Sequence, residues 1–143
     1  MKSSVVQEET TGCGIAAVAN LAGTTYAEMK SIANSLGIYA NDQVLWSSTD
    51  YVRTLLNHSG ISTSKNEVPF ESWDSLPDLA LLSIKHHIEN GKGYWHWVVF
   101  TRSNQEMFVL DSASYLKSNI RTDFNEMQPK WFIEIYSSQT TAI

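Results

Sequence analysis

The single cysteine of this chain, Cys13, stands at the start of an apolar segment with the pattern of a helix. Backbone N–H groups at a helix N-terminus have no partner within the helix, and they favour a thiolate over a thiol. Cys13 is therefore a candidate nucleophile. A free cysteine is also often a small buried apolar residue, so this residue alone leaves both interpretations open.

A nucleophilic cysteine needs a base, and His96 is the strongest candidate among the four histidines. It lies within the segment 94–100, the most apolar predicted strand, where a buried imidazole requires a hydrogen-bond partner. His58 is expected to cap the surface end of a helix. His86 and His87 follow a predicted strand and are expected in a solvated loop.

Two apolar segments joined by the short polar connection 102–105 predict an antiparallel hairpin. A turn centred in this connection places Thr101 opposite Glu106 and His96 opposite Asp111. A slip of one residue would separate the two side chains. The His96–Asp111 pair either satisfies a buried polar site or takes part in catalysis, and the two residues by themselves leave this open.

The surrounding pattern predicts the elements that position these residues. The first sixty residues indicate three helices, which begin near Cys13, Thr25 and Thr49. The remainder predicts strands at 80–85, 94–101, 106–112 and 131–136. We therefore expect one α+β domain over residues 1–143, with N-terminal helices packed on a largely antiparallel sheet.

The composition of the chain disfavours several classes of binding partner. The formal net charge is −5 and the basic residues are scattered singly, which disfavours nucleic acid or an anionic membrane as a partner. No apolar run is long enough to insert into a membrane, and no signal-peptide pattern follows Met1, so we expect a cytoplasmic location or export by a route that needs no N-terminal signal peptide. We expect no metal and no cofactor, because no Cys/His cluster has zinc-ligand spacing.

Four tryptophans have two interpretations each. Trp95 and Trp97 share one face of the predicted strand, which favours core packing over a role in a substrate groove. Trp46 and Trp73 lie in polar, loop-like contexts, where a partly buried loop anchor is favoured over a partner surface.

In order and spacing, the motifs at Gln7, Cys13-Gly14, His96-Trp97-Val98-Val99 and Val109-Leu110-Asp111 resemble those of papain-like cysteine peptidases. The resemblance is to the C39-like group, which includes the leader-peptide-cleaving domains of bacterial bacteriocin exporters. It implies a papain-like fold and a Cys13–His96–Asp111 triad. It also implies that Gln7, six residues before the cysteine, helps to form the oxyanion hole, and that the substrate is an amide bond of a peptide or protein.

Two positions depart from the family pattern. Gly12 stands where members usually have Asp, and Ser112 follows Asp111 where Pro is common. The chain also has no membrane or ATPase segment of the kind fused to the exporter domains, so a double-glycine leader stays open as the substrate. The same core resembles bacterial effector glutamine deamidases. A deamidase or acyltransferase effector or toxin, and a catalytically idle papain-like binding module, are therefore alternatives, and the oligomeric state is not predicted.

Overall fold

The computed structural model describes residues 5–6, 12–42, 48–114, 116 and 118–136. Gln7 and Trp46 lie outside these residues. The helices and strands within them have the following bounds: α1 Cys13–Ala22, α2 Tyr26–Ser35, α3 Asp50–His58, β1 Ser62–Thr63, β2 Val68–Pro69, β3 Leu79–Glu89, β4 Lys92–Ser103, β5 Glu106–Leu110, β6 Ile120–Arg121, the 3₁₀ helix η2 Phe124–Glu126, and β7 Pro129–Tyr136.

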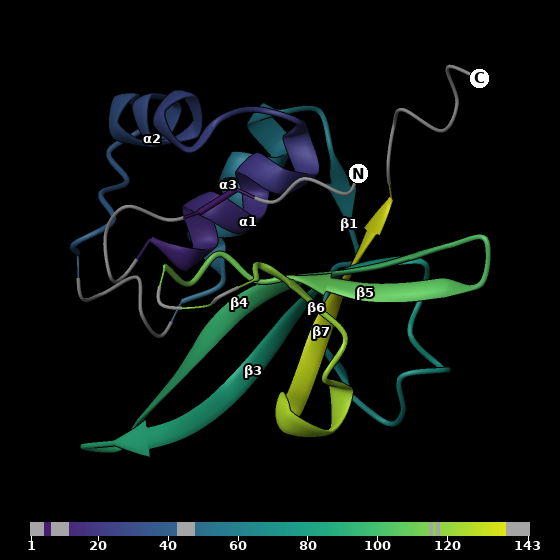
Figure 1. Ribbon diagram of the computed structural model, residues 1–143. Coiled ribbons are helices and arrows are strands. Elements are labelled where there is room, and N and C mark those ends of the chain that lie inside the picture. Colours follow the sequence, from purple (N-terminus) through teal and green to yellow (C-terminus); the bar gives the residue numbers. More distant parts are fainter. Residues whose placement is uncertain (1–4, 7–11, 43–47, 115, 117, 137–143) are drawn as a thin grey trace.

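The fold is α+β, with three N-terminal helices packed on one face of an open seven-stranded sheet (Figure 1). The strand order is β1-β7-β3-β4-β5-β6, and β2 also pairs with β7. Every pairing along this path is antiparallel. The expected arrangement of helices on a largely antiparallel sheet is confirmed.

The helices begin where the sequence predicts. Cys13 is the first residue of α1. Thr25 caps α2 through a capping box, in which Thr25 Oγ1 accepts a hydrogen bond from the Glu28 N–H at 3.1 Å and Glu28 Oε1 accepts one from the Thr25 N–H at 2.9 Å. Thr49 precedes α3, and the exposed His58 ends it, as expected. No helix in the described part of the chain is long and apolar enough to cross a membrane.

Both faces of the sheet are covered. On the helix side, α1 is buried from Gly14 to Leu21 and packs over a cluster that includes Leu81 and Val99. Alternate strand residues such as Leu82 and Val98 belong to a second cluster on the opposite face. The sequences of the central strands are therefore continuous apolar runs without polar alternation, because both faces of these strands are buried.

Loops cover the second face. Trp73 packs against Phe70, Phe100 and Phe124, with ring centroids 5.2, 5.9 and 4.8 Å away. The expectation that Trp73 is a partly buried loop anchor is confirmed. On the helix side, Trp97 is buried in the core, as expected from its position on the strand.

The hairpin of β3 and β4 is longer than predicted. His86 and His87 lie inside β3, not in a loop after it, and the hairpin extends away from the helices (Figure 1). Its turn is Asn90-Gly91, and both residues have positive φ, at 53° and 79°. An Asn-Gly pair is the preferred sequence of a two-residue hairpin turn, so the signal was present and the loop prediction was wrong.

The register predicted for the next hairpin is also wrong, by two residues. Thr101 pairs with Phe108, and Glu106 pairs with Ser103. The turn consists of two residues only, because Asn104 and Gln105 both adopt positive φ, at 52° and 68°. A shift of two residues leaves every side chain on its predicted face, since side chains alternate with period two.

One buried hydroxyl joins β3 to β7 where their pairing is irregular. Ser83 Oγ donates to the Trp131 carbonyl at 3.0 Å and accepts from the Trp131 N–H at 3.2 Å, and the register shifts just after this pair. Ser83 is fully buried. Its removal would leave two backbone groups of Trp131 without this partner.

We expect Ser83→Ala to lower the free energy of unfolding by about 1–3 kcal/mol, measured by urea denaturation. Ser35→Ala is the control, because the Ser35 hydroxyl bonds the Ile32 carbonyl at the exposed end of α2 and should matter by less than about 0.5 kcal/mol. Equal losses in the two variants would contradict the role of Ser83.

Candidate active site

His96 and Asp111 meet through a short hydrogen bond. His96 Nε2 lies 2.7 Å from Asp111 Oδ1 and donates to the carboxylate. The predicted contact is therefore confirmed, although the two residues are not directly opposite. Val99 pairs with Leu110, which places Asp111 diagonally across from His96, on the same face and within reach of a long side chain.

His96 lies where the sheet becomes irregular on both sides. Toward β5, the ladder ends at Leu110, and the Asp111 N–H donates to the Asn119 carbonyl at 2.8 Å. Toward β3, the register shifts just after the pair Ile84–His96, where Lys85 has a φ of 55°. A bulge at this point changes the direction of the strand, which is how sheets commonly aim a functional side chain.

Cys13 completes the group from the first residue of α1. It is partly buried and accepts a hydrogen bond from His96. Because Nε2 of His96 is bound to Asp111, Nδ1 is the ring nitrogen left for the sulfur. The structure thus brings together three of the four site residues predicted from the sequence. The fourth, Gln7, lies outside the described residues.

The electrostatics of the pair favour opposite charges. Burial lowers the pKa of His96, but the hydrogen bonds to Asp111 and Cys13 outweigh burial and raise the pKa to about 10. Burial raises the pKa of Asp111, but the hydrogen bond to His96 outweighs it and holds the pKa at about 2. At neutral pH the pair is a carboxylate and an imidazolium, which places a positive charge beside Cys13.

The N-terminus of α1 adds to this effect. Its N-cap is Gly12, which has no side chain to occupy the first N–H groups, and no acidic residue lies in the first turn. The first helical bond runs from the Ala16 N–H to the Gly12 carbonyl at 3.0 Å. The backbone N–H of Cys13 is thus one of the donors that a helix leaves unpaired, and it can stabilise a negative charge.

Two tyrosine hydroxyls border the cysteine on either side. A Cβ at Gly12 would lie 2.1 Å from the Tyr26 hydroxyl oxygen, and a Cβ at Gly14 would lie 2.1 Å from that of Tyr51. Both distances are far below van der Waals contact, so a larger residue at either position requires the tyrosine side chain to move.

Tyr51 is a neutral donor within this arrangement. Burial, followed by the neighbouring Cys13, raises the pKa of Tyr51 well above its ordinary value, and its oxygen accepts a hydrogen bond from the Trp97 indole. An indole N–H only donates, so the hydroxyl hydrogen of Tyr51 remains available to another group. Tyr51 was not among the predicted site residues, because nothing in its local pattern distinguishes it from a core residue of α3.

Arg121 holds the other side of Asp111. Its Nη1 donates to Asp111 Oδ2 at 2.9 Å, while Oδ1 accepts from His96 and from the Ala113 N–H at 3.1 Å. Arg121 was also not predicted, because β6 is only two residues long and has no strand periodicity in the sequence.

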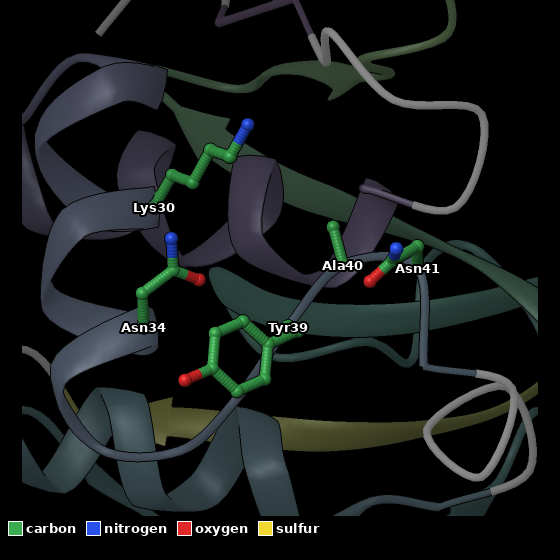
Figure 2. A pocket seen from close by; sticks show the side chains of 5 residues that line it. All are labelled: Lys30, Asn34, Tyr39, Ala40 and Asn41. Carbon is green, nitrogen blue, oxygen red and sulfur yellow. The ribbon is translucent and has the colours of Figure 1, made fainter.

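A separate hollow of about 190 Å³ lies beside α2. Figure 2 shows Lys30 and Asn34 projecting from α2, with Tyr39, Ala40 and Asn41 in the segment that follows. It is smaller than typical ligand pockets, which span about 300–1,000 Å³, and its lining contains no nucleophile paired with a base. Among the described residues, Cys13 with His96 is the pairing of a cysteine with a possible base.

Within the described residues, no group of three histidine, cysteine or acidic side chains could hold a metal ion. No family model matches the chain, and no curated protein matches it in sequence. The chemistry of the site is therefore inferred from Cys13, His96 and Asp111 themselves.

The close fit of Tyr51 against Gly14 leads to a test. Gly14→Ala should lower the free energy of unfolding by about 2 kcal/mol, because a buried ring cannot move away easily. In a Tyr51→Leu background the same change should cost nothing, or gain up to about 1 kcal/mol from the helix propensity of alanine. Urea denaturation measures both values, and an equal cost in the two backgrounds would contradict the proposed fit.

The shifted pKa values of His96 and Asp111 predict that the protein loses stability at both alkaline and acidic pH. The pKa of His96 rises from 6.5 to about 10, so its contribution is complete below pH 6.5 and is lost as the pH rises toward 10. The pKa of Asp111 falls from 3.8 to about 2, so its contribution is complete above pH 3.8 and is lost as the pH falls toward 2.

We therefore expect the free energy of unfolding to be greatest between about pH 4 and 6.5 and to fall toward pH 10. His96→Gln should remove the alkaline decline, whereas His58→Gln should retain it because His58 is exposed. Urea denaturation across this pH range measures the effect. A decline that persists unchanged in His96→Gln would show that other groups cause it.

Proposed function

We propose that this chain is a cysteine peptidase-like amide hydrolase with a papain-like, C39-like fold. The observation that carries the proposal is the position of His96, hydrogen-bonded through Nε2 to buried Asp111 at 2.7 Å and in contact with Cys13 at a helix N-terminus. The packing of an N-terminal cysteine-bearing helix on an antiparallel sheet supports the fold assignment.

The first step is attack by a thiolate–imidazolium pair. In this pair the proton of the Cys13 thiol resides on His96 Nδ1, in keeping with the raised pKa of His96. The thiolate sulfur then forms a bond to the carbonyl carbon of the substrate amide, and the carbonyl π electrons move to oxygen. Asp111 binds Nε2, which leaves Nδ1 as the ring nitrogen that faces the sulfur, and it stabilises the imidazolium.

The resulting oxyanion needs hydrogen-bond donors. The backbone N–H of Cys13 is one donor at the start of α1, and the family resemblance proposes the Gln7 side chain as the second. As the C–N bond breaks, the His96 imidazolium gives its proton to the leaving nitrogen. An amine departs and a thioester remains on Cys13.

Water completes the cycle. His96, now neutral, removes a proton from a water molecule as the water oxygen attacks the thioester carbon. The C–S bond breaks and the carboxylic acid is released, which leaves the Cys13 thiolate beside the protonated His96 as at the start of the cycle. Attack on a glutamine side chain by the same route would release ammonia, and attack by an amine in place of water would transfer the acyl group.

The activation of Cys13 can be tested by alkylation. An ordinary thiol, with a pKa near 8.5, is only about 0.1% thiolate at about pH 5.5. We expect iodoacetamide to label wild-type Cys13 at this pH at least about 100-fold faster than it labels His96→Gln. His58→Gln is the matched control and should label like the wild type, with mass spectrometry following the modification.

Equal labelling of the wild type and His96→Gln would refute an activated nucleophile and favour the idle binding module.

Activity can then be assigned with a defined substrate mixture, such as a tryptic peptide pool from a bacterial proteome. A peptidase creates new N-termini in this pool, and Cys13→Ala should abolish them, a loss of at least about 10⁴-fold in turnover. Ammonia release without new N-termini would replace the peptidase by the deamidase.

A further inference from the structure

Beyond the catalytic group, charges of alternating sign continue through the protein in a single row. His96 bonds Asp111 at 2.7 Å, Arg121 Nη1 bonds Asp111 at 2.9 Å, and Arg121 Nη2 bonds Asp123 at 2.6 Å. With Cys13, which contacts His96, at its start, this charge row has five members. The last two are unused by the mechanism above.

The interior of the charge row is shielded from water. The Asp111 side chain is 0% exposed, that of Arg121 is 10% exposed, and only Asp123, at 47%, is well exposed to solvent. Solvent ions screen buried charges only weakly, so a change of charge at Arg121 changes the electrostatic potential at His96. The row therefore couples a solvent-exposed carboxylate to the nucleophile.

Arg121 also controls the orientation of Asp111. A carboxylate can rotate, but Asp111 Oδ2 is held by Arg121 while Oδ1 accepts from His96 and from the Ala113 N–H. The segment itself is held by Asn119 Nδ2, which donates to the carbonyls of Asp111 and Ala113 at 2.7 and 2.9 Å. By binding Oδ2, Arg121 fixes the rotation of the carboxylate and thereby keeps Oδ1 directed at His96.

We propose that Arg121 is a positioning residue that orients Asp111 and sets the pH range in which Cys13 reacts, with Asp123 as its counter-charge. The inference rests on the proposed function, because it takes Cys13 as the nucleophile. It concerns a different property of the site, since hydrolysis itself does not require a second cation on Asp111.

The sign of the effect follows from the charges. Loss of the Arg121 cation removes positive charge from the site, so the thiolate forms at higher pH. Loss of the Asp123 anion leaves Arg121 less neutralised, so the thiolate forms at lower pH. Within the described residues, the titratable groups of the row itself are Cys13 from α1, His96 from β4, Asp111, Arg121 from β6 and Asp123. Two further titratable groups lie beside its start, Tyr26 from α2 and Tyr51 from α3.

The test compares Arg121→Gln with Asp123→Asn, which change the charge by one unit in opposite directions. The rate of Cys13 alkylation by iodoacetamide is measured from about pH 4 to 9. We expect the acid limb of the profile to move up by about 0.5–1 pH unit in Arg121→Gln and down by a smaller amount in Asp123→Asn, where solvent screens the charge. Arg121→Lys, which keeps the charge, should lie closer to the wild type than Arg121→Gln does.

A merely structural role would not produce opposite shifts. Unshifted limbs, or shifts in the same direction, would overturn the proposal. If Arg121→Gln does not fold, the proposal is tested by the two remaining variants. A downward shift in Asp123→Asn, with a profile of Arg121→Lys close to that of the wild type, supports it, and an unshifted limb in Asp123→Asn overturns it.

A second readout separates this inference from the proposed function. The His96 imidazole can be titrated by NMR in each variant, with its midpoint moving up in Arg121→Gln and down in Asp123→Asn. If Cys13 proves unreactive in the wild type, the peptidase proposal fails while these midpoints still test the role of Arg121. Unchanged midpoints would refute the role of Arg121 even in an active peptidase.

Discussion

The structure of this site depends on one buried carboxylate. Asp111 has no exposure to solvent, and a charge in that position is costly unless it is paired and fully hydrogen-bonded. Its oxygens receive hydrogen bonds from His96, Arg121 and the Ala113 N–H. β5 ends just before Asp111, and Arg121 lies in the short strand β6. The local architecture is explained by the need to satisfy this group.

Cys13 lies in a second constrained region, the closely packed surroundings of the start of α1. The two glycines beside Cys13 leave space for the hydroxyls of Tyr26 and Tyr51, which come from α2 and α3. All three helices therefore contribute to the surroundings of the sulfur, while the sheet contributes His96. A site assembled from residues of all three helices and of several strands requires the core to be complete, so the stability of the fold and the geometry of the site are linked.

Local patterns predicted much of this arrangement. The capping box at Thr25, the helix beginning at Cys13 and the apolar strand around His96 were predicted because periodicity and capping residues act over a few positions. The hairpin registers were less accurate. Residues with positive φ, Asn104 and Gln105, shortened one turn and moved the register by two, and the contact of His96 with Asp111 survived because an even shift preserves the face.

The sequence by itself determined the class of fold and the residue types that can react: a cysteine at a helix N-terminus and a histidine in an apolar strand. Only the tertiary structure decided which ring nitrogen faces the sulfur and that Tyr51 and Arg121 complete the surroundings. The physical reason is the range of the interactions. Helix and strand patterns arise from neighbours in sequence, whereas contacts between distant elements follow from how the whole core packs.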